Sequence, residues 1–415
     1  MPLPVRRHSG RAAGAGSGTP GDPLRTSAEP RRAAGRTLAG FALLLPLLAC
    51  APQAPPVAQP RFAPPFGGGY AGIAPREPPR ERVGLLLPLS GGNRALGAAM
   101  LNAAQLALFD GADPRVELVP RDTGGTAGGA AEATRAALAD GARAFAGPLT
   151  RDETAAAANV TRASAAPLLD FTSDGSLAAP GVWVLGLTPS EQAERVIGAA
   201  AAGGAQRFGL LAPNDLFGRR LEEALRARLA IAGLPPPVVV LYVPRADISG
   251  PARQLAEAVG PEGLDAVLLG DRGAPVRSAA AALAEALPRP ARLLGTTLWL
   301  GDAGLGQEPA LVGAWFPAPD PASRQRFEAR YQTAFGAPAP PLAGVAYDAA
   351  ALALRALRDG GGAPPIGAPM QGADGPIVLL ADGQARRGLA IMAVDASGEP
   401  VLVEPAPLPP GVPAF

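Results

Sequence analysis

The stretch RVGLLLPLSGGNRALG, residues 82–97, joins an apolar segment to a predicted helix through a glycine-rich turn. A turn of this kind can hold an anion, because unpaired backbone N–H groups point outward at a helix N-terminus. The spacing of Gly91, Gly92 and Gly97 matches neither G-x-G-x-x-G nor G-x-x-x-x-G-K-[ST], the two common nucleotide-binding patterns. We therefore expect a small polar ligand or none at this loop, with Ser90 offering a hydroxyl group.

Several residue types that catalysis commonly uses are missing. All 37 basic residues are arginine, the only histidine is His8 and the only cysteine is Cys50. If the chain is cleaved before Cys50, it retains no imidazole for general-base catalysis or metal ligation and no lysine for a Schiff base. Catalysis by a pair of carboxylates remains possible, but the sequence contains no dense acidic cluster. We predict a protein that is not an enzyme and that needs neither cofactor nor metal.

The charge pattern speaks against a nucleic-acid partner. From Cys50 onward the chain has 30 arginines and 34 acidic residues, which gives a net charge of −4. The arginines are scattered and form no basic stripe, so we expect no binding to nucleic acid.

Residues 1–49 have the pattern of a signal peptide. Arginines precede an apolar run over residues 38–49, which is short for a membrane span. The run ends in LLAC, and this resembles the lipobox of bacterial lipoproteins, in which the cysteine, here Cys50, is lipidated. A buried apolar segment with an incidental cysteine is the alternative. Because Ala51 is not aspartate, the sorting rule for such lipoproteins implies a periplasmic protein anchored to the outer membrane of a Gram-negative bacterium.

Residues 50–81 are expected to form a disordered, lipidated tether. Nine of the thirty residues from Ala51 to Arg80 are proline, and a run of three glycines lies at 67–69. Such a composition cannot bury a core. At about 3.1 Å per residue the tether would reach on the order of 90 Å.

From residue 82 onward, short apolar segments alternate with alanine-rich helical segments. Apolar strands separated by helices indicate a parallel sheet that is covered on both faces. Capping-box patterns mark helix starts at Thr150 and Thr188. We expect strands at 83–88, 116–120, 143–147 and 167–171, and helices near 93–110, 127–140 and 151–163.

The pattern then restarts. RFGLLAP, residues 207–213, matches RVGLLLP at five of seven positions. Further strands are expected near 237–243, 264–269 and 291–295, so the chain has two α/β units. We predict an α/β fold with two doubly wound parallel-sheet lobes and a cleft between the carboxyl ends of their sheets.

The last part of the chain is expected to be shared between the two lobes. LVGAWFPAPD, residues 311–320, and helices around 321–335 and 342–358 should return to the first lobe, and a hairpin should turn around Asp382-Gly383. The predicted bounds are 82–187 plus about 318–360 for the first lobe, and 188–317 plus about 374–404 for the second.

Five motifs in this order resemble the type 1 periplasmic binding proteins of the leucine/isoleucine/valine-binding kind: RVGLLLPLSG, LVPRDTGGT, AGPLT, PLLDFTSD and PNDLFGRRL. Within that superfamily, the LLPLSG and RDTGGT forms on a lipoprotein are most similar to the penicillin-binding protein activators. The resemblance covers about residues 82–395. It implies two lobes joined by three crossovers, with a cleft that can hold a small ligand.

The resemblance also implies where an amino acid would bind. In amino-acid-binding members, the loop after the third strand holds the ligand carboxylate, and Thr150 and Arg151 lie there in this chain. The loop after PLLDF normally faces the ligand ammonium group. In this sequence it contains Phe171, Thr172, Ser173 and Asp174.

The acidic residue that would pair with the ammonium group is absent from its expected place. Thr296 and Thr297 follow the glycine of LLGTTL instead. The amino-acid clamp is therefore incomplete, unless Asp174 or Asp271 replaces the missing charge.

Structural roles compete with these ligand roles. Thr150 is equally consistent with a helix cap alone, and Asp174 with a turn residue. Asn214 and Asp215 are expected to cap the helix DLFGRRLEEAL, with Phe217 at the cleft edge. Trp299 and Trp315 lie on apolar runs and are predicted to be core residues.

We predict a non-enzymatic, lipid-anchored periplasmic protein that stimulates a penicillin-binding protein, a peptidoglycan synthase. The lipobox, the tether and the departures at Arg151 and Thr297 favour this function. The alternative is the substrate-binding component of an ABC importer for branched-chain or related amino acids, whose partner would be a permease. A third hypothesis is a ligand-sensing partner of a membrane receptor.

Overall fold

The computed structural model describes residues 80–408, except 245–246 and 360–361. The predicted signal peptide, the lipidation site Cys50 and nearly all of the predicted tether lie outside the described residues and stay predictions. Within the described part, no helix is both long and apolar enough to cross a membrane.

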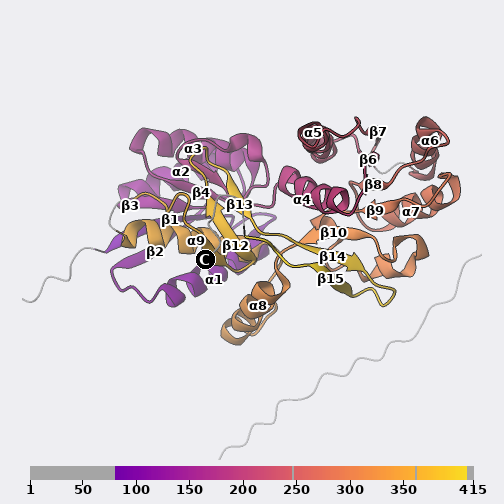
Figure 1. Ribbon diagram of the computed structural model, residues 1–415. Helices are drawn as coiled ribbons and strands as arrows, with labels where there is room; N and C mark the ends of the chain where they lie inside the picture. The colour runs from indigo at the N-terminus through magenta and orange to yellow at the C-terminus, as the bar shows by residue number, and fades with distance from the viewer. Residues whose placement is uncertain (1–79, 245–246, 360–361, 409–415) are drawn as a thin grey trace, which may run out of the picture. The chain divides into compact units, whose positions relative to one another are not determined.

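The first lobe is built on a five-stranded sheet with the order β2-β1-β3-β4-β5, in which every pairing is parallel (Figure 1). The strands predicted for this lobe are confirmed, and the short β5 was missed. The strands are β1 (Glu81–Leu87), β2 (Val116–Asp122), β3 (Ala142–Ala146), β4 (Leu168–Asp170) and β5 (Val182–Val184). The helices are α1 (Arg94–Gly111), α2 (Ala127–Ala139), α3 (Arg151–Ser164) and α9 (Ala343–Arg358).

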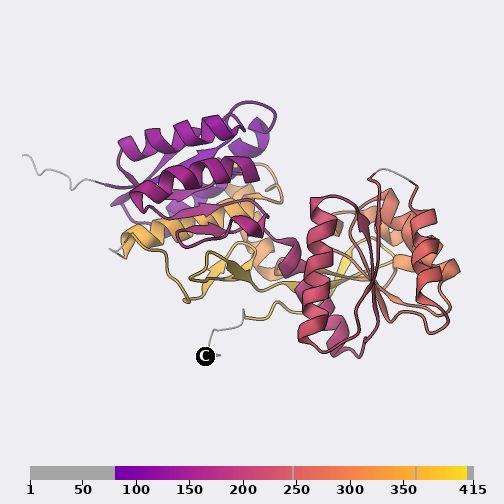
Figure 2. The same cartoon turned by 90° about the horizontal axis from the view of Figure 1, so that it is seen from above.

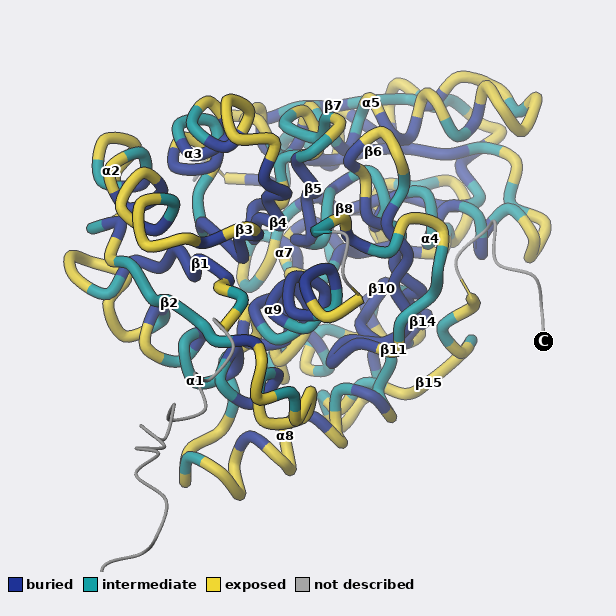
Figure 3. The backbone as a smooth tube through the Cα atoms, turned by 90° about the vertical axis from the view of Figure 1, so that its left-hand side faces the viewer, coloured by how far each residue is buried: buried dark blue, intermediate teal, exposed yellow. Residues whose placement is uncertain are grey.

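Helices cover both faces of this sheet, which explains the continuous apolar sequence of β1. Leu85 and Leu87 join a core cluster with residues of α1 and α9, whereas Leu86 joins a separate cluster with residues of α2 and α3. All three side chains are fully buried. Figure 3 shows α9 buried over most of its surface, in agreement with its almost wholly apolar sequence.

The second lobe is built on a seven-stranded sheet with the order β15-β14-β10-β9-β8-β6-β7. The strands from β7 to β10 are parallel, and β14 and β15 add antiparallel pairings at one edge. Helices lie on both sides of the sheet (Figure 2). The parallel strands are β6 (Phe208–Pro213), β7 (Val238–Tyr242), β8 (Ala266–Leu269), β9 (Arg292–Leu294) and β10 (Trp315–Ala318). The helices are α4 (Pro189–Ala202), α5 (Leu216–Ile231), α6 (Ser249–Val259) and α7 (Ala274–Ala286).

Short 3-10 helices complete the connections. They are η1 (Gly175–Leu177), η2 (Thr297–Trp299), η3 (Ala303–Gln307) and η4 (Pro309–Leu311).

The two lobes repeat one packing detail. The helix after the first strand of each lobe carries a glycine in its first turn, Gly97 in α1 and Gly218 in α5. A Cβ atom at either position would collide with the carbonyl oxygen of the proline that follows or ends the strand, Pro88 or Pro213. The resemblance between RVGLLLP and RFGLLAP therefore extends to the way each strand meets its helix.

The end of the chain differs from the prediction in part. The segment 311–320 was expected to lead back to the first lobe, with the boundary near residue 318, and β10 lies in the second sheet between β9 and β14, in agreement with that boundary. The reason is Phe316, which is buried in the second core with its ring centroid 6.0 Å from that of Trp299. Residues 374–404 were expected in the second lobe, but Ile377 and Leu379 pack in the first core.

A small antiparallel sheet therefore belongs to the first lobe, and the predicted hairpin around Asp382-Gly383 lies within it. Gly383 has φ +89°, as a hairpin turn often requires. Only β14 and β15 continue into the second sheet. The remaining elements are α8 (Pro321–Phe335), β11 (Met370–Gly372), β12 (Gly375–Leu379), β13 (Ala385–Arg387), β14 (Ala390–Val394) and β15 (Pro400–Glu404).

Alanine at Gly97 or Gly218 should destabilise the protein, since the clash is with backbone and forces the helix away from its strand. We expect a loss of about 1–3 kcal/mol for each variant, the usual cost of overpacking. The matched control is Gly92→Ala, because nothing lies within 4 Å of a Cβ atom there. Urea unfolding of the three variants measures this, and equal midpoints for all three would contradict it.

Candidate functional site

A cavity of about 560 Å³ is lined by residues of both lobes, a volume suited to a small organic molecule. Its walls come from the start of α3, the loop after β4, the starts of α4 and α5, and the β12–β13 hairpin. The lining residues are Arg151, Thr172, Ser173, Asp174, Gly175, Ser176, Ala178, Val184, Thr188, Pro189, Ser190, Glu191, Glu194, Leu216, Phe217, Arg220, Gln384, Ala385 and Arg386.

Three α-helices begin at this cavity. Both predicted capping boxes are confirmed: Thr150 caps α3 with Glu153, and Thr188 caps α4 with Glu191. Asp215 caps α5 by accepting a hydrogen bond of 2.9 Å from the backbone N–H of Gly218. Each helix N-terminus carries a partial positive charge that attracts anions, and a carboxylate of the chain, Glu153, Glu191 or Asp215, lies at each of them.

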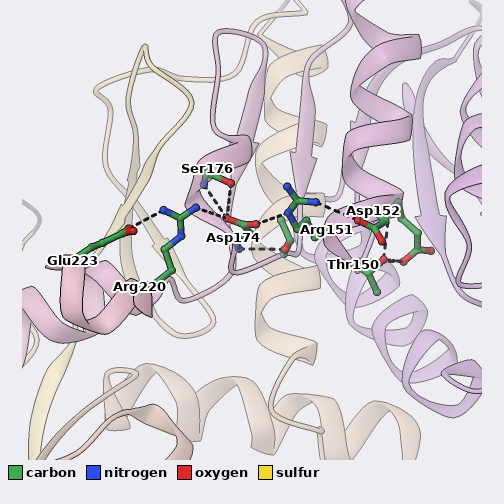
Figure 4. A network of polar contacts seen from close by, with 9 residues as sticks. Thr150, Arg151, Asp152, Asp174, Ser176, Arg220 and Glu223 are labelled. Carbon is green, nitrogen blue, oxygen red and sulfur yellow. Dashed lines mark hydrogen bonds and ion pairs between the residues drawn. The ribbon is translucent and has the colours of Figure 1, made fainter. Parts of the chain in front are cut away.

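Asp174 is the centre of a row of alternating charges (Figure 4). Its carboxylate accepts hydrogen bonds from Arg151 Nε at 2.8 Å and from the hydroxyl of Ser176 at 2.7 Å. Arg220 Nη2 of the second lobe lies 3.9 Å from the same carboxylate, and Arg220 Nη1 donates to Glu223 at 2.8 Å. The charge of Asp174 is thus already balanced by arginines from both lobes.

The pKa of Asp174 reflects these contacts. Partial burial acts to raise the pKa, but the hydrogen bonds from Ser176 and Arg151 outweigh it and hold the pKa below the ordinary aspartate value. The carboxylate is therefore ionised near neutral pH.

The loop that carries Asp174 is held by hydrogen bonds that begin at Asp170, a fully buried residue at the end of β4. Asp170 Oδ1 accepts a hydrogen bond of 3.0 Å from the Thr172 N–H, and Thr172 Oγ1 accepts one of 3.2 Å from the Asp174 N–H. Burial raises the pKa of Asp170 well above its usual range. Phe171 is 2% exposed and packs in the first core, so it does not line the cavity.

The opposite wall holds a second ion pair. Arg386 Nη1 of β13 lies 3.0 Å from Glu194 Oε2 of α4. Glu191 also lines this wall, and burial raises its pKa against the opposing effect of the Arg387 charge. All three acidic residues on the cavity walls, Asp174, Glu191 and Glu194, thus have positively charged neighbours.

The predicted site residues fall into two groups. Five of the ten line the cavity: Arg151, Thr172, Ser173, Asp174 and Phe217. The other five, Ser90, Thr150, Phe171, Asp271 and Thr297, are not among its lining residues.

The glycine-rich turn at residues 89–92 holds an anion that belongs to the chain itself. Oδ1 of Asp122 accepts hydrogen bonds from the backbone N–H groups of Leu89, Ser90 and Gly124, at 2.8, 3.1 and 2.8 Å. Hydrogen bonds from Ser90 and Gly124 lower the pKa of Asp122 and keep it charged. The backbone donors expected to meet a small polar solute are occupied by this carboxylate.

Asp271 and Thr297 serve contacts within the second lobe. Asp271 Oδ2 accepts a hydrogen bond of 2.6 Å from the Tyr242 hydroxyl. The backbone N–H and the hydroxyl of Thr297 both donate to Gln192 Oε1, at 3.0 and 2.9 Å. Neither residue supplies a charge to the cavity, so the amino-acid clamp remains incomplete.

The two tryptophans differ. Trp299 is buried, as predicted, and donates a hydrogen bond of 3.0 Å to the carbonyl of Asp271. Trp315 is only half-buried, and the Arg292 guanidinium lies 4.1 Å from the centroid of its ring.

Sequence reasoning missed Arg220, Glu191, Glu194 and Arg386. Arg220 had a usable signal, because it lies three residues after Phe217 on a predicted helix and therefore on the same face. Arg386 had none, since only the tertiary position of the hairpin brings it to the cavity. In the described part of the chain, no group of three or more His, Cys, Asp or Glu side chains could hold a metal ion.

The family model of the periplasmic binding proteins matches residues 81–399, and the chain belongs to this family. Its two doubly wound lobes are those of the type 1 members, the leucine/isoleucine/valine-binding-like proteins. No curated protein matches the sequence.

Solved structures share the fold at low identity. A putative branched-chain amino acid ABC transporter protein from Rhodospirillum rubrum is 19% identical with a TM-score of 0.67, covering 78% of this chain and 100% of that chain. A solute-binding protein from R. palustris in complex with benzoate is 18% identical with a TM-score of 0.56, covering 81% and 99%. A leucine-binding protein from Thermotoga maritima is 18% identical with a TM-score of 0.54, covering 78% and 97%.

Asp174→Asn should reduce the sensitivity of the protein to acid. Because the folded-state pKa of Asp174 is lowered, its contribution to stability is present above the unfolded-state pKa of about 3.9 and is lost as the pH falls. We expect the variant to lose less stability than the wild type between pH 6 and pH 3, measured by urea unfolding. The control is Asp152→Asn, which removes an exposed partner of the same Arg151. A wild-type pH profile in the Asp174 variant would contradict the assignment.

Proposed function

We propose that this chain is a solute-binding protein that takes a small organic carboxylate into the cavity and delivers it to an import system. The observation that carries this proposal is the charge arrangement of the cavity. Three helix N-termini and three arginines, Arg151, Arg220 and Arg386, border it, and the arginines and the acidic side chains of the wall are neighbours of one another. The arrangement supports binding of an anion, because both helix dipoles and guanidinium groups attract carboxylates.

The incomplete clamp favours a carboxylate without an ammonium group. An amino acid needs an uncompensated acid for its ammonium, and Asp174 is engaged by two arginines while Thr297 is engaged by Gln192. Among proteins with this fold, one from R. palustris was solved with benzoate and one from T. maritima is a leucine-binding protein. The lack of an uncompensated acid on the cavity walls favours a ligand without an ammonium group, and amino acids form the comparison in the test.

A thermal-shift panel tests the proposal with benzoate, 4-hydroxybenzoate, succinate and leucine. A ligand at 100 times its Kd stabilises the fold by about 2.7 kcal/mol, so at least one carboxylate should raise the Tm clearly. We expect Arg220→Met to weaken that ligand at least tenfold, about 1.4 kcal/mol. Arg226→Met is the matched control, since Arg226 lies on the same helix, pairs with Glu222 and does not line the cavity.

The panel has two outcomes that would contradict the proposal. One is a shift with leucine and none with the carboxylates, which would favour an amino-acid importer. The other is a carboxylate shift that Arg220→Met and Arg226→Met reduce equally, which would place binding outside the cavity.

A second function is stimulation of a penicillin-binding protein, for which we infer support from the Asp174–Arg220 pair. This pair joins the loop after β4 to α5, so side chains of the chain itself bridge the two lobes. The predicted lipid anchor at Cys50, the tether and an outer-membrane location belong to the same proposal, since a synthase in the inner membrane requires a long reach.

Glycan polymerisation by a purified bifunctional penicillin-binding protein tests this second function. Addition of the mature chain should raise the polymerisation rate several-fold with no small molecule present. The control is the same chain with Arg220→Met, which removes the bridge. An unchanged rate with the wild-type chain, tested against synthases of the same organism, would contradict stimulation.

A further inference from the structure

A buried ion pair lies where the chain passes between the lobes. The Arg387 side chain is 1% exposed and its Nη1 atom lies 2.5 Å from Oδ2 of Asp348 in α9, which is fully buried. Asp348 Oδ1 accepts a hydrogen bond of 2.6 Å from the Ala373 N–H, which fixes the neighbouring Asp374. Asp374 in turn pairs with Arg324 of α8 at 3.0 Å.

All three crossovers are tied to this cluster or to its immediate neighbours. In the first, residues 185–188, the carbonyl of Leu185 accepts a hydrogen bond of 3.2 Å from Arg387 Nε. In the second, residues 319–320, the Asp320 N–H donates to the carbonyl of Asp374 at 3.0 Å. The third, residues 388–389, directly follows Arg387 itself.

The cluster also reaches the cavity wall. The backbone N–H of Arg387 donates to Oε1 of Glu191 at 3.2 Å, while Oε2 of Glu191 accepts from the Thr188 cap. Glu191 therefore spans from the start of α4 to β13. The Nη2 atom of Arg387 is buried and has no hydrogen-bond partner among the described residues, so this guanidinium still has donor capacity inside the cluster.

We infer that Arg387 is a positioning residue that fixes the first crossover and the start of α4 relative to β13 and α9. Its side chain holds the Leu185 carbonyl and its main chain holds Glu191, so one residue sets both ends of the crossover. The consequence for binding rests on the proposed function, because the start of α4 is part of the wall that would meet a carboxylate. The positioning itself does not depend on a ligand.

Charged groups face Arg387 from every element packed against it. They are Glu191 of α4, Asp348 of α9 and Asp374 between β11 and β12, with Arg324 of α8 beyond. Burial raises the pKa of Asp348 and of Glu191, and the Arg387 charge opposes both effects. Loss of this cation should raise both pKa values further. Ionisation of the two acids would then loosen the crossover as the pH rises.

Amide hydrogen exchange of the full chain tests the inference without any ligand. In Arg387→Met we expect the segment 185–192 to exchange at least tenfold faster than in the wild type, after correction for intrinsic rates. The acceleration should be larger at pH 8 than at pH 6, and Arg387→Lys should restore most of the protection. The matched control is Arg324→Met, which removes a partly buried arginine of the same cluster that does not contact Glu191 or Leu185.

Three results would overturn the inference. Protection of 185–192 equal to the wild type in Arg387→Met is one, and equal acceleration of that segment in Arg324→Met is the second. The third is a loss of protection in β1 and β6 of Arg387→Met that equals the loss in 185–192 and does not depend on pH. Such a result indicates general destabilisation only. If Arg387→Met does not fold, Arg387→Lys is compared with Arg324→Met instead. Wild-type protection of residues 185–192 in Arg387→Lys, at both pH 8 and pH 6, supports the inference. Faster exchange of this segment in both variants overturns the inference. Failure of the carboxylate panel leaves this measurement unaffected.

Discussion

The buried pair between Arg387 and Asp348 is the constraint on which the join between the two lobes depends. Burying two charges costs several kcal/mol per ion, and attraction offsets this only when further hydrogen bonds satisfy both groups. Here the Leu185 carbonyl and the Ala373 N–H supply two such bonds, and Arg387 Nη2 is left without a hydrogen-bond partner among the described residues. Leu185 lies in the first crossover, and Ala373 precedes Asp374, which binds the second. The hydrogen bonds of the ion pair therefore restrict the positions of these chain segments between the lobes.

Close backbone packing accompanies this pair. A Cβ atom at Gly372 would come within 2.5 Å of Asp348 Oδ1, and one at Gly344 within 2.5 Å of Asp374 Oδ2. Only glycine at these positions lets the main chain approach the two carboxylates. The small sheet β11–β12–β13 is thereby held against α9 in the first lobe, although β14, which follows it directly, belongs to the second.

Most of the fold could be predicted from the sequence, because strands buried on both faces have continuous apolar runs and because helix starts have strong local signals. Thr150 and Thr188 are capping-box residues both in the sequence pattern and in the structure. The lobe of the segment 311–320 could not be read from its sequence, since WFPA is equally apolar in either sheet and only its pairing with β9 and β14 decides the matter. The positions of Arg151 and Asp174 at the cavity follow from the strand ends, since Arg151 begins α3 and Asp174 lies on the loop after β4, and their role in binding stays a prediction. Arg386 could not be found, because no local pattern brings a hairpin residue to a distant helix.

If the cavity takes a carboxylate, as we propose, the charges of its walls determine which ion pairs the ligand has to replace. A carboxylate that binds Arg151 or Arg220 has to compete with Asp174, which already holds the former at 2.8 Å and lies near the latter. Exchanging one carboxylate for another keeps the number of ion pairs nearly constant, so the gain must come from the additional helix N-termini and from apolar contact with Phe217 and Leu216. A zwitterion also carries an ammonium group. This group adds binding energy only if it forms an ion pair with Asp174 after the ligand carboxylate has replaced Asp174 at its arginines. In the proposed function, the same side chain would therefore penalise anions that lack apolar surface and would be a partner for the ammonium group of an amino acid.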